Sequence, residues 1–259
     1  MMAMSRWTWA AASRCGLSHT LAGERRQDAL RVNAALDGSV MVAIACDGAG
    51  SASHGGLGAA LAARVLARCA KTHFASCPRA PSHEDMMQWV YAARQMIAEA
   101  AVRRKLKLSD LATTAVVAVS NGRCTMTAHI GDGAILARAA DVGDGGPQCW
   151  HALSWPEHGE YVSTTFFLTD ASIQPRIAAH VMEIDRMVVM TDGMERLALD
   201  FALGVPHEPF LEGVCAPLAP TQDGGRDRPL SSALARYLGS QTVNVRTDDD
   251  KTLILAALG

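Results

Sequence analysis

The sequence predicts an α+β fold in which β-sheets are covered by helices. Three features indicate this class: an early pair of strand-like runs, two long helical segments between residues 56 and 105, and a later series of short strand-like runs. Strands and helices do not alternate regularly, which disfavours a doubly wound parallel sheet. The 259 residues suffice for one large domain with an ample core. Since no linker is visible, we expect a single domain over residues 1–259.

The first half of the chain supplies a hairpin and the two long helices. Residues 29–36 and 40–46 are apolar runs on either side of Asp37-Gly38, a two-residue turn signal. Apolar residues at four-residue spacing then predict a helix over residues 56–74. After two prolines, Ser82 is a suitable N-cap for a second helix that runs to about residue 105.

The second half is richer in strands. Asn121-Gly122 joins two apolar runs and is the strongest hairpin signal in the chain. The composition predicts a loop over 141–147, irregular structure over most of 201–230, and a short helix near 231–239. Strands are expected at 113–119, 123–130, 134–138, 149–153, 164–169, 178–184, 187–191 and 252–257.

Composition excludes several classes of protein. Charged residues make up 19% of the chain and the formal net charge is −2, which argues against nucleic acid or an anionic membrane as a partner. The seven cysteines are scattered and form no C-x-x-C motif, which argues against a disulfide framework and structural zinc. The N-terminal stretch is a poor signal peptide, and no run approaches the roughly 20 apolar residues that span a bilayer. We therefore expect a cytoplasmic monomer.

Aspartates mark the borders of several strand-like runs. Asp47-Gly48 and Asp192-Gly193 each follow an apolar run directly, and Asp28 and Asp249 lie beside two others. A single Asp-Gly pair is most simply a turn, but two copies after apolar runs are less expected by chance. Carboxylates that converge form a hard, oxygen-rich site for Mg²⁺ or Mn²⁺. Metal-assisted hydrolysis of a phosphate is therefore the leading hypothesis.

In their order and spacing, these residues resemble the metal-dependent serine/threonine protein phosphatases of the 2C type (the PPM family), in a bacterial branch. The similarity extends from about residue 16 to residue 257, although each block is short. The matching blocks are Gly16-Leu17-Ser18-His19, Gln27-Asp28-Ala29, Val42 to Gly50, Thr113 to Val117, His129 to Gly133, Val188 to Gly193 and Asp249 to Leu253.

The resemblance implies two antiparallel β-sheets packed face to face, with helices outside and a site at one end. It implies hydrolysis of phosphoserine and phosphothreonine in proteins by a hydroxide that bridges two Mn²⁺ or Mg²⁺ ions. The phosphoprotein substrates would be products of a Ser/Thr kinase. By this resemblance, Asp47 would be the catalytic ligand that bridges both metal ions, and Asp192 would be a second catalytic ligand. The Gly48 carbonyl and Asp249 would be further metal ligands. Asp28 would bind through water, and Asp132 would belong to a third, weaker metal site.

Several positions depart from the family pattern. Gln27 replaces an acidic or amide partner of Asp28 and carries no charge. The arginine that holds the substrate phosphate in some members has no direct counterpart, and Arg25 or Arg26 would have to substitute for it; simple exposure is the competing interpretation. Gly133 and Ala134 stand where Ser and Arg are usual, and Ala49 stands where eukaryotic relatives carry a histidine. We therefore assign no general acid.

Two rival functions compete with this interpretation. The segment Asp248-x-Asp250-x-Thr252 matches the nucleophile motif of haloacid-dehalogenase-type phosphatases, but only seven residues follow Thr252, too few for the domain that motif requires. The second rival is a catalytically inactive phosphatase that binds phosphoproteins or a regulatory partner. The uncharged Gln27 is consistent with that alternative, whereas the presence of the main acidic residues favours an enzyme.

Overall fold

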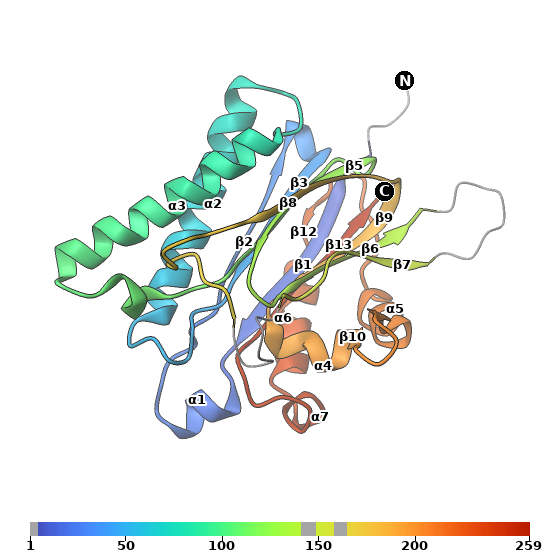
Figure 1. Ribbon diagram of the computed structural model, residues 1–259. Helices are drawn as coiled ribbons and strands as arrows, with labels where there is room; N and C mark the ends of the chain where they lie inside the picture. The colour runs from blue at the N-terminus through green and yellow to red at the C-terminus, as the bar shows by residue number, and fades with distance from the viewer. Residues whose placement is uncertain (1–4, 141–148, 158–164) are drawn as a thin grey trace.

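Two β-sheets pack face to face and carry helices on their outer faces (Figure 1). The structure is a computed structural model that describes residues 5–140, 149–157 and 165–259. Apolar side chains from both sheets, among them Trp7, Met41 and Ile135, fill the space between them. The predicted α+β class and the two-sheet arrangement are both confirmed.

The five-stranded sheet contains both predicted pairs of strands. Its order is β2-β3-β4-β5-β8, with every neighbouring pair antiparallel. The two-residue turn predicted at Asp37-Gly38 is wrong, because Ala35 pairs with Val40 and residues 36–39 form the connection. At the Asn121-Gly122 turn, the Asn121 side-chain oxygen accepts the backbone N–H groups of Arg123 and Cys124, at 3.0 and 2.8 Å. The strands span Ala29–Ala35 (β2), Val40–Cys46 (β3), Ala115–Ser120 (β4), Cys124–Ile130 (β5) and Arg176–Val181 (β8).

The six-stranded sheet has the order β12-β1-β13-β9-β6-β7, in which only the β1–β12 pair is parallel among the pairings described. We did not predict β1 as a strand. Its side chains are buried on both faces, with Ala10 in the outer core and Trp9 between the sheets, so it lacks the polar–apolar alternation that identifies a strand with one solvent-exposed face. The strands span Trp7–Arg14 (β1), Ala134–Ala139 (β6), Trp150–Ser154 (β7), Ile184–Met190 (β9), Gly225–Arg226 (β12) and Lys251–Leu258 (β13).

Two long helices, α2 (Gly55–Ser76) and α3 (His83–Arg104), cover the outer face of the five-stranded sheet. Alanines dominate the buried face of α2, which lets the helix lie close to β2 and β3. The predicted N-cap is confirmed, because the Ser82 hydroxyl accepts the Asp85 backbone N–H and the Asp85 carboxylate accepts the Ser82 N–H.

Shorter helices cover the six-stranded sheet. The helix α5 (Glu208–Cys215) lies within the segment predicted to be mostly irregular, and that prediction is wrong there. Eight residues with a proline in the first turn give too short a pattern to detect. The predicted late helix is α6 (Arg228–Leu238), which begins three residues early. The remaining short elements are α1 (Leu17–Leu21), α4 (Glu195–Ala198), α7 (Gln241–Asn244), β10 (Leu199–Asp200), β11 (Val205–Pro206) and the 3-10 turns Leu36–Gly38, Leu108–Leu111 and Asp192–Met194.

The strand predicted at 164–169 does not form within its described part. Residue 165 makes an isolated bridge and residues 168–169 form a turn, in which the Leu168 backbone N–H donates to the Thr113 carbonyl at 2.8 Å. The predicted loop at 141–147 lies outside the described residues.

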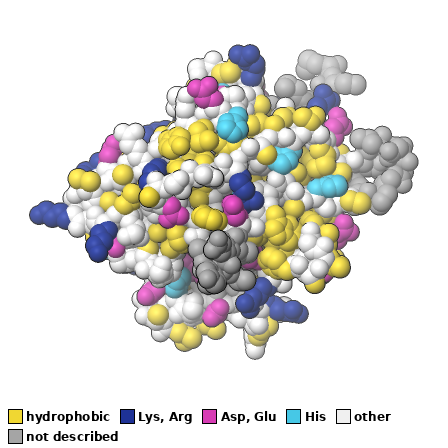
Figure 2. Space-filling view, viewed as in Figure 1, with side chains coloured by type: hydrophobic (Ala, Val, Ile, Leu, Met, Phe, Trp, Pro, Cys, Tyr) yellow, Lys and Arg dark blue, Asp and Glu magenta, His cyan; other side chains and the backbone are white. Residues whose placement is uncertain are grey.

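The surface visible in Figure 2 intersperses acidic, basic and apolar side chains, in keeping with the small net charge. Within the described part of the chain, no helix is long and apolar enough to cross a membrane.

Candidate metal centre

Three of the predicted aspartates meet where strands of both sheets end. Asp47 follows β3, Asp132 follows β5 by two residues, and Asp192 follows β9 by two. Each contributes one carboxylate oxygen to a group whose members all lie within 4.8 Å of one another. Strands from two packed sheets therefore deliver three acids, far apart in sequence, to one point.

Asp28 borders the same group from the start of β2 and is buried. Its Oδ2 accepts hydrogen bonds from the hydroxyls of Thr191, at 2.9 Å, and Thr252, at 2.6 Å. Its Oδ1 is buried and has no hydrogen-bond donor among the described residues. Burial raises the pKa of Asp28 to about 6, against hydrogen bonds with Thr252, Asp47 and Thr191, while the charge of Asp250 adds to the rise.

Burial and, after it, mutual repulsion raise the pKa values of the acids at the centre. Burial, followed by the charges of Asp28 and Asp192, raises the pKa of Asp47 well above its usual range. Burial, followed by the charges of Asp132 and Asp249, does the same to the pKa of Asp192. Asp249 therefore lies close enough to influence both, although it is outside the tight group of three.

These residues fit a divalent cation. A buried carboxylate oxygen without a donor, beside acids that raise one another's pKa, is stabilised by a positive ion. Carboxylate oxygens are hard ligands, and Mg²⁺ and Mn²⁺ prefer such ligands.

Two glycines allow the backbone to pack tightly around the carboxylates. A Cβ on Gly193 would lie 1.9 Å from the Asp250 carbonyl oxygen, and a Cβ on Gly48 would lie 2.2 Å from the Gly55 carbonyl carbon. Gln27 faces the carbonyl oxygens of Gly48 and Ala49. With its amide nitrogen toward them, it donates to each at 3.2 Å. Gln27 thus orients the backbone carbonyl that the resemblance assigns to a metal.

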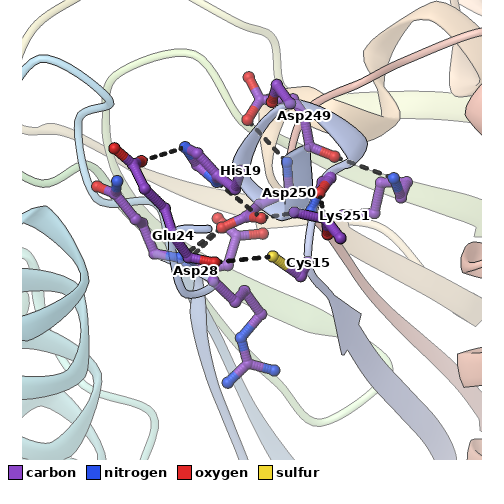
Figure 3. A network of polar contacts seen from close by, with 12 residues as sticks. Cys15, His19, Glu24, Asp28, Asp249, Asp250 and Lys251 are labelled. Carbon is purple, nitrogen blue, oxygen red and sulfur yellow. Dashed lines mark hydrogen bonds and ion pairs between the residues drawn. The ribbon is translucent and has the colours of Figure 1, made fainter. Parts of the chain in front are cut away.

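Asp250 is a site residue that the sequence analysis missed. Its Oδ1 accepts the Gly16 backbone N–H at 2.6 Å, and its Oδ2 accepts those of Gln27 and, at 3.3 Å, Asp28. The His19 Nδ1 lies 3.1 Å from Oδ1 (Figure 3). Asp250 therefore ties the segment that carries Asp28 to the segment that carries Asp249. Among three adjacent aspartates, nothing in the sequence distinguishes this inward-facing one.

Behind these acids lies a buried lysine. The Lys251 Nζ donates to the Asn244 side-chain oxygen at 3.0 Å and to the Asp249 carbonyl at 3.1 Å. Burial lowers the pKa of Lys251, although the charges of Asp250 and Asp249 oppose this shift. The lysine fixes the backbone at Asp249 and supplies a positive charge behind it.

Two further acids complete the surroundings of Asp192. The Asp132 Oδ2 accepts the Thr165 hydroxyl at 2.6 Å. Glu195, three residues after Asp192, was not anticipated from the sequence. Burial and then the charge of Asp132 raise the pKa of Glu195 to about 8. The proximity of Glu195 to Asp132 depends on the turn after β9, which no short motif indicates.

The structure does not bring Arg25 or Arg26 into contact with the carboxylates. Both are exposed, and the Arg26 guanidinium donates to the Ser13 backbone carbonyl at 3.1 Å. Arg26 instead lines a cavity of about 530 Å³ beside Asp28.

Comparisons with known proteins agree on one family. Residues 15–239 match the family model described as protein phosphatase 2C. The chain is 31% identical over 255 residues to serine/threonine-protein phosphatase 3 of Escherichia coli (strain K12), covering 96% of this chain and 98% of that one.

Solved structures show the same fold. The catalytic domain of the serine/threonine protein phosphatase PstP, in complex with two manganese ions, superposes with a TM-score of 0.64 at 15% identity, covering 98% of this chain and 99% of that one. The phosphatase Stp1 from Staphylococcus aureus gives a TM-score of 0.63 at 13% identity, covering 100% and 96%.

Proposed function

The chain belongs to the protein phosphatase 2C family of metal-dependent serine/threonine protein phosphatases, and from this premise we propose how its own residues carry the reaction. The proposed substrates are proteins phosphorylated by a Ser/Thr kinase, and the proposed ions are two Mn²⁺ or Mg²⁺, with a third at a weaker site. We propose that residues 1–259 act as a single domain and as a monomer.

The convergence of Asp47, Asp132 and Asp192 carries this proposal. Asp47, Asp192, Asp249 and the Gly48 carbonyl would hold the two principal ions, and Asp47 would be shared between them. Asp28 would act through water, and Asp132 would belong to the third site. When bound, the ions supply a water of lowered pKa and neutralise negative charge on the phosphoryl oxygens.

The chain's residues prepare the site for that chemistry. Thr191 and Thr252 hold one oxygen of Asp28 by hydrogen bonds, which leaves the other oxygen directed away from these hydroxyls. Gln27 orients the Gly48 carbonyl. Asp250 fixes the backbone of Asp28 and Lys251 that of Asp249, so the carboxylates are held in place before an ion binds.

Arg25 and Arg26 remain proposed contacts for the substrate. Their exposure supports contact with a protein substrate outside the carboxylate cluster rather than with the scissile phosphate. The same cluster of acids favours an enzyme over the catalytically inactive alternative, because a protein that only binds phosphoprotein gains nothing from buried acids that raise one another's pKa.

Release of phosphate from a phosphothreonine peptide tests the proposal. We expect turnover that requires Mn²⁺ or Mg²⁺, that stops with a chelator, and that falls at least about 10²-fold in Asp47→Asn and Asp192→Asn. Asp223→Asn, at an exposed aspartate remote from the cluster in sequence, is the matched control and keeps full activity. Calorimetric binding of Mn²⁺ by a protein that releases no phosphate from a panel of phosphopeptides would establish the inactive alternative instead.

A further inference from the structure

The polar cavity that Arg26 lines lies beside the metal centre, on the flank where β1 and β2 face α2 and α6. Its volume is about 530 Å³. Three arginines line it: Arg26 before β2, Arg31 within β2, and Arg226 within β12. They come from parts of the chain about 200 residues apart, so the fold, rather than a local run of basic sequence, gathers this charge.

Arg26, Arg31 and Arg226 are exposed residues, and among the described residues their guanidinium groups donate to neutral oxygen atoms. Arg26 donates to the Ser13 carbonyl at 3.1 Å, and Arg31 donates to its neighbouring Leu30 carbonyl at 2.8 Å. Arg226 donates to the Ser231 hydroxyl at 3.3 Å and to the Ala11 carbonyl at 3.4 Å. Within the described residues, none of the three forms an ion pair with a carboxylate.

This cavity is complementary to a phosphoryl group. An arginine presents five N–H donors in a planar fork that matches the oxygens of a phosphate. Here most of those donors are left over after the contacts to the protein, and the three positive charges lack an acidic partner at the surface. The exposed Ser232, in the second turn of α6, belongs to the same lining, and its hydroxyl donates to the Arg228 carbonyl at 3.0 Å.

Asp28 joins the cavity to the metal centre. The residue lines the cavity, while its carboxylate is buried and its Oδ2 is held by Thr191 and Thr252. The negative charge of Asp28 is therefore turned toward the metal centre. Because Asp28 belongs both to the cavity lining and to the surroundings of Asp47, one bound peptide can face the cavity and the metal centre. An extended chain covers about 3.3 Å per residue, so the number of residues between two phosphorylated positions sets the span they can cover.

We propose that the cavity lined by Arg26, Arg31 and Arg226 binds a second phosphoryl group on the same protein substrate. The preferred substrate is then a segment that carries two phosphorylated residues, one hydrolysed at the metal centre and one held by the arginines. This inference rests on the proposed phosphatase activity, but it concerns substrate choice rather than the reaction itself.

Peptides with one and with two phosphothreonines test the inference. In the two-phosphate series, the second group is placed two to six residues before or after the first. At one or more spacings, we expect kcat/KM for the first phosphate to exceed that of the single-phosphate peptide by at least about tenfold, equivalent to about 1.4 kcal/mol. The advantage shrinks as salt rises from 50 to 500 mM, because screening weakens exposed charge pairs.

Substitutions then locate the effect. Arg31→Gln combined with Arg226→Gln removes the advantage and leaves turnover of the single-phosphate peptide unchanged. Arg64→Gln combined with Arg68→Gln, at two exposed arginines of α2, is the matched control and keeps the advantage. An advantage that persists in the first pair, or that no spacing produces, overturns the proposal. So does an equal advantage when glutamate replaces the second phosphothreonine, because the cavity would then select acidic residues in general.

A binding measurement separates this proposal from the proposed activity. Fluorescence anisotropy of labelled peptides, in the presence of chelator, reports affinity without turnover. Tighter binding of the two-phosphate peptide, lost in Arg31→Gln with Arg226→Gln, supports the cavity even if no peptide is hydrolysed. Equal binding of both peptides refutes it even if hydrolysis is normal.

Discussion

Neighbouring Asp249 and Asp250 are expected to respond in opposite ways to the same substitution. Asp250 accepts three backbone N–H groups, whereas the half-buried Asp249 carboxylate accepts that of Asp250 at 2.7 Å. Asp250→Asn keeps only one acceptor oxygen. If that oxygen keeps the hydrogen bond from the Gln27 N–H, the new amide group faces the Gly16 N–H. In the native protein the Gly16 nitrogen lies 2.6 Å from the Asp250 Oδ1.

The stability lost in Asp250→Asn follows from these contacts. A buried N–H that loses its partner costs about 1–3 kcal/mol, and the remaining bonds lose the added strength of a charged acceptor. Relief of repulsion with Asp28 offsets part of this, so we expect a loss of about 2–4 kcal/mol in unfolding free energy. With roughly 2.1 cal/mol/K of unfolding entropy per residue over 259 residues, Tm falls by about 4–8 °C.

Asp249→Asn keeps an oxygen for the Asp250 N–H and removes one repelling charge from Asp47 and Asp192. We expect its metal-free Tm to be unchanged or slightly raised, while its affinity for Mn²⁺ falls at least about tenfold. Scanning calorimetry with chelator and titration calorimetry with Mn²⁺ measure the two quantities. The reasoning is refuted if Asp250→Asn leaves Tm within 1–2 °C of wild type, or if Asp249→Asn loses as much stability as Asp250→Asn.

Three further outcomes are expected. Gly193→Ala lowers the unfolding free energy by about 1–3 kcal/mol or more, because its Cβ would lie 1.9 Å from a carbonyl oxygen. Gly50→Ala, which has open space around it, leaves the unfolding free energy unchanged, and urea unfolding of both variants measures the difference. The affinity for Mn²⁺ rises from pH 5 to 7.5, because the raised pKa values of Asp28 and Asp47 keep protons on these ligands at low pH. Calorimetry in two buffers of different ionisation enthalpy detects the protons released on binding, and a pH-independent affinity would contradict the prediction. The pKa of Asp28 is about 6 in the folded protein against an ordinary 3.8, so metal-free wild type loses stability relative to Asp28→Asn as pH rises from about 4 to 7; urea midpoints at each pH show whether it does.

Local sequence patterns were sufficient for the hairpins and long helices. Asn121-Gly122 specifies its turn because Gly122 adopts a positive φ of 85° and the Asn121 side chain accepts two backbone N–H groups of the turn. Ser82 with Asp85 specifies a helix start through contacts three residues apart. The strand β1 escaped prediction because burial on both faces removes the alternation, and α5 escaped it because eight residues give too little periodicity.

The sequence by itself determined which residues to propose for the metal centre: Asp47-Gly48 and Asp192-Gly193, each in a strand-end motif that is readable without a structure, and Asp47 and Asp192 do lie together in the fold. Only the tertiary structure decided that Asp250, rather than a solvent-facing neighbour, joins two distant segments, and that three arginines share one cavity. The physical reason is the separation along the chain over which each kind of interaction acts. Turn, cap and motif signals act over a few residues, whereas burial, repulsion between carboxylates and shared cavities depend on which segments the packed sheets bring together.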